Sequence, residues 1–335
     1  MTLKDIAKEA GVSTVTVSNV INGNYRKVSK ETIEKVNKII DARNYHPNAT
    51  ARSLAAKKSR IIAVVLPDLG DGQYFSESPY YTEIMSCLER EIRNRGYYMM
   101  IRCVGACREV IPLFLSWNVD GIIFLGAYKD EVEEIVPKLD CPAVYIDTYA
   151  SDLPIANVGI NDYKGGYLAT RYLIGRGHTS IAWAGPDYND PGVINERYKG
   201  FLDACTEKGI EVSEQNCFVG MTSFEQGVKL GEKIAFSSVK YTAVVCMSDI
   251  LAFGIMDGLR RTGVIVPDDI SVVGFDNIPA CSYSNPQLTT VSQNIREKAE
   301  LSAKVLFDMI TEDKKIVTNE HVDVEIVERQ SVKSI

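Results

Sequence analysis

The feature of this sequence that most limits its fold is an alternation, from Arg60 onwards, of short apolar runs with stretches of helical periodicity. The apolar runs predict strands at residues 61–66, 97–103, 121–125, 143–146, 180–184, 217–219, 243–246 and 270–273. The stretches between them predict helices at residues 80–95, 110–117, 131–139, 164–176, 195–208, 225–236 and 249–261. Strands without polar alternation, each followed by a helix, indicate parallel sheets covered on both faces. The two successive series therefore predict two doubly wound lobes.

The chain is expected to pass between these lobes three times, near residues 157–161, 286–291 and 318–322. The helical stretch at residues 292–311 should then pack on the first lobe, although it comes late in the sequence. Three crossings would let the lobes close around a ligand without unfolding either lobe.

Polar side chains at strand ends are the candidates for a ligand site, because two-lobed α/β proteins bind ligands outside the carboxyl ends of their strands. Asp147, Ser248 and Asp276 each follow or end an apolar run, and Arg197 lies at the start of a predicted helix. Carboxylates accept hydrogen bonds from hydroxyl groups and Arg donates in a fork, so this set suits a ligand rich in hydroxyls. The alternative for each polar residue is a helix cap or a turn.

Four aromatic residues follow the first strand, and one or two of them are expected to stack on the ring of the ligand. They are Tyr74, Phe75, Tyr80 and Tyr81, and the alternative is that they are ordinary surface or core residues.

Residues 1–45 have the pattern of a helix-turn-helix followed by a third short helix. Thr2, Ser13 and Ser29 are placed to cap the three helices. In the second helix the apolar residues face inward, whereas Thr14, Val15, Ser18 and Asn19 face outward. Short polar and β-branched groups on an exposed helix suit recognition of the DNA major groove. The alternative is an ordinary three-helix bundle with a polar face.

The distribution of charge favours DNA binding by this end of the chain. Residues 1–60 contain twelve Lys and Arg against five Asp and Glu, a net charge of +7. The remaining residues contain 25 against 39, a net charge of −14, so the overall value of −7 hides two opposite regions. A basic module on an acidic body is expected where phosphate contact is confined to one end.

Residues 46–59 are predicted to form a hinge helix that folds only when it pairs with its copy on DNA. Pro47 separates this run of helix formers from the preceding helix, and the run is too short to be stable alone in water. Leu54 has no core to join and is expected to act as a wedge between base steps in the minor groove. The alternative is a plain linker.

Several short motifs in the first fifty-five residues together resemble the lactose-repressor/galactose-repressor (LacI/GalR) family, which includes lactose-, galactose- and purine-repressor-like proteins. The motifs are Leu3-Lys-Asp-Ile-Ala, Ala10-Gly-Val-Ser, Thr16-Val-Ser, Asn22-Gly, Val28-Ser, Asn44-Tyr-His-Pro-Asn and Ala51-Arg-Ser-Leu-Ala. The resemblance implies that Thr14, Val15 and Asn19 read bases. It also places a wider set close to DNA, namely Thr2, Ser13, Thr16, Ser18, Asn22, Asn48, Ala51 and Leu54. Many members have Arg where this chain has Asn19, and Asn reads adenine where Arg reads guanine.

The resemblance continues over nearly the whole chain, in motifs such as Arg197-x-x-Gly-Phe, Ser248-Asp and Val266-Pro-Asp-Asp-Ile-Ser-Val-Val-Gly-Phe-Asp-Asn. It implies a core like that of the sugar-binding periplasmic proteins, with Asp147, Arg197, Ser248 and Asp276 as effector contacts and Tyr81 beside them. Ser248 stands where Asn is frequent in the family.

The expected protein is thus an all-α helix-turn-helix headpiece (1–45), a hinge helix (46–59) and a core of two doubly wound parallel-sheet lobes (60–335). The expected function is that of a homodimeric transcriptional regulator, a repressor, which binds a near-palindromic operator and is controlled by a small effector, a sugar or sugar derivative, bound between the two lobes. The alternatives are a solute-binding protein or sugar-active enzyme that shares only the core, and a regulator whose co-effector is a partner protein. The resemblance does not separate dimer from tetramer, although residues 331–335 show no coiled-coil repeat.

Other classes of function lack a motif in this sequence. The eight cysteines show no zinc-type spacing and are expected to be reduced residues of a cytoplasmic protein. With three histidines there is little material for a metal site or a catalytic relay, and His178 is expected to be a turn residue. We therefore expect no catalysis, no cofactor, no metal and no membrane span.

Overall fold

The computed structural model describes residues 2–45, 58–68, 74–189 and 191–335. The chain divides into two compact units, which we call the head (residues 1–59) and the core (residues 60–335). Residues 46–57 of the predicted hinge helix, which include Asn48, Ala51 and Leu54, lie outside the described residues.

The head contains the three helices that the sequence predicts, α1 (Leu3–Ala10), α2 (Thr14–Ile21) and α3 (Lys30–Ala42), with a single 3-10 turn at Tyr25–Lys27. All three predicted caps are confirmed: the side chains of Thr2, Ser13 and Ser29 accept hydrogen bonds from backbone N–H groups in the first turns. The helices share a small core made of Ile6, Ala7, Ala10, Val17, Val20 and Val36.

The core has two six-stranded sheets, one in each lobe. The sheet of the first lobe has the order β11-β5-β4-β3-β1-β2, and its strands are β1 (Ile61–Pro67), β2 (Tyr98–Val104), β3 (Gly121–Leu125), β4 (Ala143–Ile146), β5 (Ala156–Ile160) and β11 (Thr318–Val322). The sheet of the second lobe has the order β12-β10-β9-β8-β6-β7, and its strands are β6 (Ile181–Gly185), β7 (Cys217–Val219), β8 (Ala243–Cys246), β9 (Ser271–Asp276), β10 (Thr289–Ser292) and β12 (Glu325–Val327). Only the pairing of β12 with β10 is antiparallel among these described strands.

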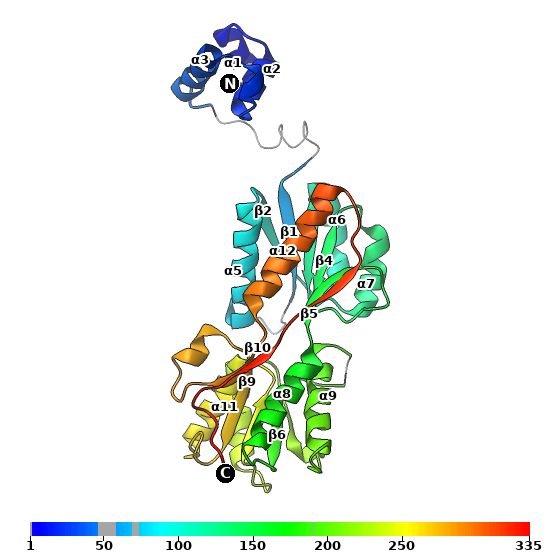
Figure 1. The fold of residues 1–335 in the computed structure, drawn as a ribbon, viewed down its shortest axis with the longest axis vertical. Coiled ribbons are helices and arrows are strands. Elements are labelled where there is room, and N and C mark those ends of the chain that lie inside the picture. The colour runs from blue at the N-terminus through cyan, green and yellow to red at the C-terminus, as the bar shows by residue number, and fades with distance from the viewer. Residues whose placement is uncertain (1, 46–57, 69–73, 190) are drawn as a thin grey trace. The chain divides into compact units, whose positions relative to one another are not determined.

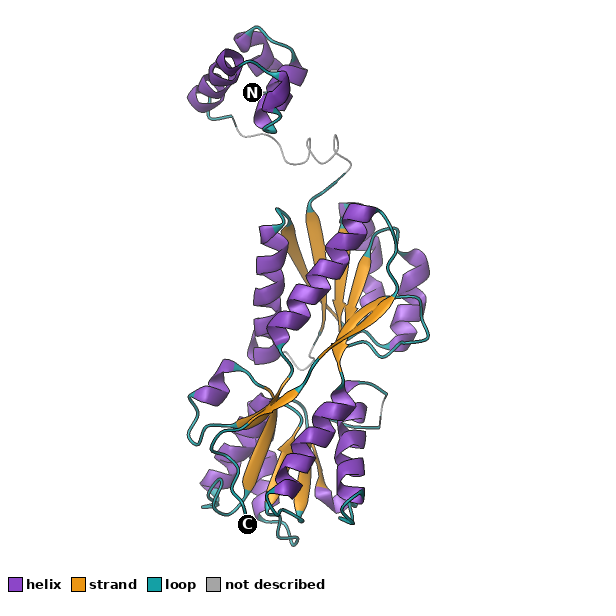
Figure 2. Ribbon diagram, viewed as in Figure 1, coloured by secondary structure: helices purple, strands orange, loops and turns teal. Residues whose placement is uncertain are grey.

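Helices cover both faces of each sheet (Figure 2). The first lobe has α5 (Pro79–Asn94), α6 (Ile111–Trp117), α7 (Lys129–Ile135) and α12 (Ile295–Glu312). The second lobe has α8 (Asp162–Gly175), α9 (Val193–Thr206), α10 (Phe224–Ala235) and α11 (Asp249–Arg261). The central strands are buried on both faces, since every residue of β3, β6 and β8 is buried. The predicted fold class, a helical head followed by two doubly wound α/β lobes, is confirmed.

The chain crosses between the lobes three times: after β5, after β10 and after β11 (Figure 1). As predicted, α12 packs on the first lobe, where Ala299 and Leu306 join a core cluster with residues of β1 and α5. The segments predicted as crossings overlap strands β5, β10 and β11, and the chain crosses directly after each of them; the sequence predicts neither these three strands nor β12.

Two glycines allow the backbones of α8 and α9 to touch. A Cβ atom added to Gly166 would lie 2.0 Å from the carbonyl oxygen of Arg197, and one added to Gly200 would lie 2.1 Å from that of Tyr163. Because real atoms do not approach so closely, neither position accepts a larger residue unless the helices move apart. This close contact fixes the position of Arg197 relative to α8.

His178 has a structural role that differs from the predicted turn. Its ring is fully buried and its two nitrogens lie 3.0 Å from the hydroxyl of Thr242 and 3.1 Å from the carbonyl oxygen of Lys333. Burial lowers the pKa of His178, which favours the neutral ring. The ring therefore anchors residues 331–335 to the second lobe.

Candidate functional site

The outward face of α2 carries the residues that the sequence predicts for base contact. Val15 is 67% exposed, Thr14 is exposed and Asn19 is half-buried. An exposed valine does not stabilise the fold by burial, but it can contact the methyl group of thymine in a major groove. The three side chains therefore lie on a surface that can meet base edges.

The polar residues predicted near phosphates also have local roles in the head. The Thr2 hydroxyl donates to Asp5, the Ser13 hydroxyl lies 2.9 Å from that of Thr16, and the Asn22 amide donates to the Ser18 hydroxyl at 3.2 Å. These bonds are at the surface, where hydroxyl and backbone N–H groups at a helix start can also receive a phosphate. Capping and phosphate contact are compatible at these positions.

A cleft of about 500 Å³ in the core brings together all five residues that the sequence predicts as effector contacts. Its lining includes Tyr81, Asp147, Arg197, Ser248 and Asp276. Tyr80 and Tyr128 also line it, whereas Tyr74 is exposed and Phe75 packs against the hydrophobic core of the first lobe.

Local backbone conformation directs the strand-end residues into the cleft. Asp147 follows β4 with a φ of 56°, and Asp276 ends β9 with a φ of 120°. Both values are unfavourable for residues other than glycine, so the surrounding contacts must hold them. Ser248 caps α11 by accepting a hydrogen bond from the N–H of Leu251, so the alternative of a capping role also applies to it.

Asp249 holds the loop that follows Asp276. Its buried carboxylate accepts hydrogen bonds from the Thr290 hydroxyl at 2.6 Å, the Ile278 N–H at 2.9 Å and the Cys281 thiol at 3.0 Å. Burial, followed by the nearby Asp249 carboxylate, raises the pKa of Asp276 to about 8. Asp276 is therefore largely a neutral carboxylic acid near pH 7.

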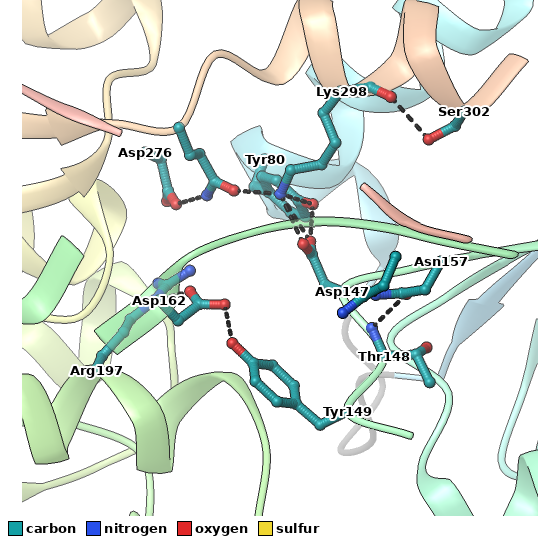
Figure 3. A network of polar contacts seen from close by, with 12 residues as sticks. Tyr80, Asp147, Thr148, Tyr149, Asn157, Asp162, Arg197, Asp276, Lys298 and Ser302 are labelled. Atoms are coloured by element: carbon teal, nitrogen blue, oxygen red, sulfur yellow. Dashed lines mark hydrogen bonds and ion pairs between the residues drawn. The ribbon is translucent and has the colours of Figure 1, made fainter. Parts of the chain in front are cut away.

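Arg197 is buried in a polar cluster of second-lobe residues, which Tyr149 of the first lobe joins (Figure 3). Its Nε donates to Asp162 Oδ1 at 2.8 Å, and its Nη1 donates to the carbonyl oxygen of Met247 at 2.7 Å. The guanidinium also lies over the ring of Phe275, 3.6 Å from its centre, and Tyr149 donates to the other oxygen of Asp162 at 2.6 Å. These contacts fix the plane of the guanidinium at the edge of the cleft.

Asp147 is part of a second cluster, which links the two lobes (Figure 3). Lys298, on α12, donates to both oxygens of Asp147 at 2.8 and 2.9 Å, and Tyr80 donates to Asp147 at 2.6 Å. Lys298 also donates to the side-chain oxygen of Gln293 at 2.6 Å, and the Gln293 amide donates to Asp276. A continuous polar chain thus runs from the end of β4 to the end of β9.

Four polar side chains of these clusters, Tyr149, Asp162, Gln293 and Lys298, are absent from the sequence prediction. A signal exists for Lys298, since it is a charged residue on the face of α12 that also carries Ala299 and Ser302, all of them buried. No comparable signal pairs Asp162 with Arg197, because the two lie far apart in the sequence.

The part of the chain that the structure describes contains no group of three potential metal ligands and no helix long and apolar enough to cross a membrane. The eight cysteines are free, and Cys107, Cys205, Cys246 and Cys281 are buried whereas Cys103 is exposed.

Comparison with protein families gives two matches. Residues 2–48 match the model described as bacterial regulatory proteins of the lacI family, and residues 170–332 match a periplasmic binding protein-like domain.

Comparison with individual proteins gives similarities along the full length. The chain is 34% identical to the HTH-type transcriptional repressor PurR of Vibrio atlanticus, over 100% of this chain and 99% of that protein. It is 25% identical to the lac repressor in a dimer bound to operator and the anti-inducer ONPF. That match has a TM-score of 0.86 and covers 100% of this chain and 99% of the lac repressor chain. A LacI family regulator from Enterococcus faecium with bound ribose is 28% identical. That match has a TM-score of 0.71 and covers 82% of this chain and 99% of the other chain.

Proposed function

The chain belongs to the lacI family of bacterial regulatory proteins and is a DNA-binding transcriptional repressor; we propose that a small effector, bound between its lobes, controls its affinity for an operator. The observation that carries this proposal is the convergence of Tyr81, Asp147, Arg197, Ser248 and Asp276 in one cleft. A ligand that contacts both lobes changes the balance between open and closed cores, and closure can alter the spacing of two heads.

We propose a sugar or a sugar derivative as the effector. Arg197 and Asp276 offer a donor and an acceptor at one edge, Tyr80, Tyr81 and Tyr128 offer aromatic surface, and a family member with bound ribose supports this class. A nucleobase is the second candidate, because a planar ring with donor and acceptor edges fits the same groups and the similar repressors bear the name PurR.

For the operator we propose that Thr14, Val15 and Asn19 contact bases, and that Thr2, Ser13, Thr16, Ser18 and Asn22 lie near phosphates. The exposure of Val15 and the net charge of the first sixty residues support this assignment. We further propose that the protein is a homodimer in which the head divides into a helix-turn-helix domain (1–45) and a hinge (46–59), that the core (60–335) follows, and that Asn48, Ala51 and Leu54 contact DNA. The lac repressor dimer on its operator supports this arrangement.

Two measurements on the full-length protein test the proposal. Selection from a pool of random duplexes should enrich an inverted repeat, and thermal-shift screening with sugars, nucleobases and nucleosides should identify a ligand. That ligand should change operator affinity by about 5- to 150-fold, the usual range of coupling between two sites. A protein that prefers no inverted repeat over random duplex, with or without these compounds, would contradict the operator assignment.

The change Leu54→Ala tests the proposed wedge. We expect operator affinity to fall by at least about tenfold, because the cost of unstacking base steps is no longer repaid by an inserted side chain. Affinity for nonspecific duplex should change less than about twofold, since it depends on phosphate contacts. Fluorescence anisotropy with both duplexes at one salt concentration measures the two effects, and equal losses would contradict the wedge.

A further inference from the structure

Lys298 is a buried cation whose donors are all engaged by the protein. Its side chain has no solvent exposure, and the ammonium donates to Asp147 Oδ1 at 2.8 Å, to Asp147 Oδ2 at 2.9 Å and to Gln293 Oε1 at 2.6 Å. An ammonium group has three N–H donors, so these contacts satisfy it. Because a buried charge without a partner is very costly, Lys298 and Asp147 depend on each other.

The charge of Arg197 is likewise matched by a carboxylate, which belongs to the second lobe. Its ion pair with Asp162 joins two side chains that are 7% and 0% exposed, and a second nitrogen is bonded to the carbonyl oxygen of Met247. The guanidinium keeps further N–H groups that can donate to a neutral acceptor, since it has five donors in total. Its charge, however, is already matched by a carboxylate.

The cleft is therefore balanced in charge before a ligand enters. Lys298 is matched by Asp147, Arg197 is matched by Asp162, and burial raises the pKa of Asp276 to about 8, so that this carboxyl group is largely neutral. Among the described residues of the lining the other charged side chain is Asp68, which has an interaction of its own and is exposed to solvent, which screens its charge. An anion that enters must break an internal pair or remain unmatched, and so must a cation that meets Asp147 instead of the exposed Asp68.

We propose that Lys298 sets the charge specificity of the cleft, so that the effector is an uncharged ring compound without a phosphate, carboxylate or ammonium group. By matching Asp147, Lys298 removes the part-buried carboxylate of the first lobe that would otherwise attract a cation. Recognition is left to the free N–H groups of Arg197 and to Asp276. This inference rests on the proposed function, because it requires that an effector occupies the cleft.

Lys298 also positions the groups that meet the ligand. Through Gln293, whose amide donates to Asp276, it connects α12 of the first lobe to the end of β9 in the second. A neutral donor on the ligand can bond to Asp276 without disturbing this chain, whereas a charged group competes with it.

The test is a cycle of charge-changing variants read with probes that share one ring. The probes form three series, each with an uncharged compound and a charged derivative of it. The first is glucose, glucosamine and glucose 6-phosphate, the second is ribose and ribose 5-phosphate, and the third is adenine, adenosine and adenosine monophosphate. Wild-type full-length protein should bind the uncharged member of one series most tightly, as measured by thermal shift and titration calorimetry. Tighter binding of the phosphate or amino form by the wild type would overturn the proposal.

The variants should change the preferred charge in opposite directions. Lys298→Met leaves Asp147 unmatched and should shift the ratio of dissociation constants toward an amino probe by at least about tenfold. Asp147→Asn leaves Lys298 unmatched and should shift the ratio toward a phosphate probe by a similar factor. The double variant should again prefer the uncharged probe. Single variants that leave the order of the probes unchanged would overturn the proposal.

A control on the same helix separates specificity from overall charge. Lys304→Met removes one positive charge from an exposed pair with Asp308 and should leave the order of the probes unchanged. If one single variant unfolds, the other still decides, because each is expected to shift the preferred charge in its own direction and a folded single variant without that shift would overturn the proposal. A wild type that no probe stabilises would instead remove the proposed effector site itself, and this inference with it.

Discussion

Arg197→Ala is expected to abolish the response to the effector and to lower the free energy of unfolding of the core by about 3–5 kcal/mol. The guanidinium is buried between Asp162, the carbonyl oxygen of Met247 and the ring of Phe275, so its removal leaves the Asp162 carboxylate buried without a cation. Operator binding by protein that remains folded should persist, because it depends on the head. Operator binding with and without the effector, together with urea unfolding, measures both effects.

The loss of stability should depend on pH. Burial raises the pKa of Asp162, and Arg197 opposes this shift. Without Arg197 the pKa of Asp162 rises further, and a group whose pKa is raised by folding stabilises the fold at low pH and loses that contribution as the pH rises through the folded-state pKa. Arg197→Ala should therefore be less destabilising at about pH 5 than at about pH 8.

Two further variants check this explanation. Asp162→Asn combined with Arg197→Ala removes the unmatched charge and should recover most of the stability without restoring the effector response. Arg171→Ala, which removes an exposed pair with Glu207, should cost less than about 1 kcal/mol. If Arg197→Ala alone still responds to the effector, Arg197 is not a contact.

Gly166→Ala is expected to destabilise the second lobe by about 3 kcal/mol or more and to weaken effector binding. The new methyl group would lie 2.0 Å from the carbonyl oxygen of Arg197, and that atom belongs to the backbone and cannot rotate away. Helix α9 must then move from α8, which separates Arg197 from Asp162 at the start of α8. Overpacking usually costs about 1–3 kcal/mol, and a contact between two backbones belongs at the upper end or beyond.

Gly175→Ala is the matched control in the same helix. No atom lies within 4 Å of the Cβ position of Gly175, so alanine should be neutral or should stabilise α8 by up to about 1 kcal/mol. Thermal unfolding and calorimetric titration of both variants measure the difference. Equal behaviour of the two variants would mean that the contact between α8 and α9 tolerates expansion.

The central strands and their helices could be predicted because burial on both faces leaves a continuous apolar run in the sequence. The four strands beside the crossings could not. In β11 only Val322 is buried, and β5 contains Asn157 and Gly159, which are unfavourable in strands. These strands depend on pairing with strands that are distant in the sequence, as β11 pairs with β5.

Asp147, Ser248 and Asp276 could be found because the carboxyl ends of parallel strands meet at one edge of a sheet, whereas Arg197 and Tyr81 lie in helices and are predicted from the family resemblance and from a run of aromatic residues. Their partners could not be found by the same rule. Asp162 begins α8 and Lys298 lies inside α12, and neither position is a strand end. Consequently the sequence predicts five residues that line the cleft, but not that the charges of two of them, Asp147 and Arg197, are already matched.

The three crossings have a consequence for the order in which the protein is made. The head is one continuous segment, so it can fold as soon as it leaves the ribosome, whereas neither lobe is complete until α12, β11 and β12 have been translated. During that interval the apolar strands of both lobes lack part of their covering, which is when nascent chains aggregate and chaperones bind. A newly made head could therefore associate with DNA before the core beside it is able to respond to any metabolite.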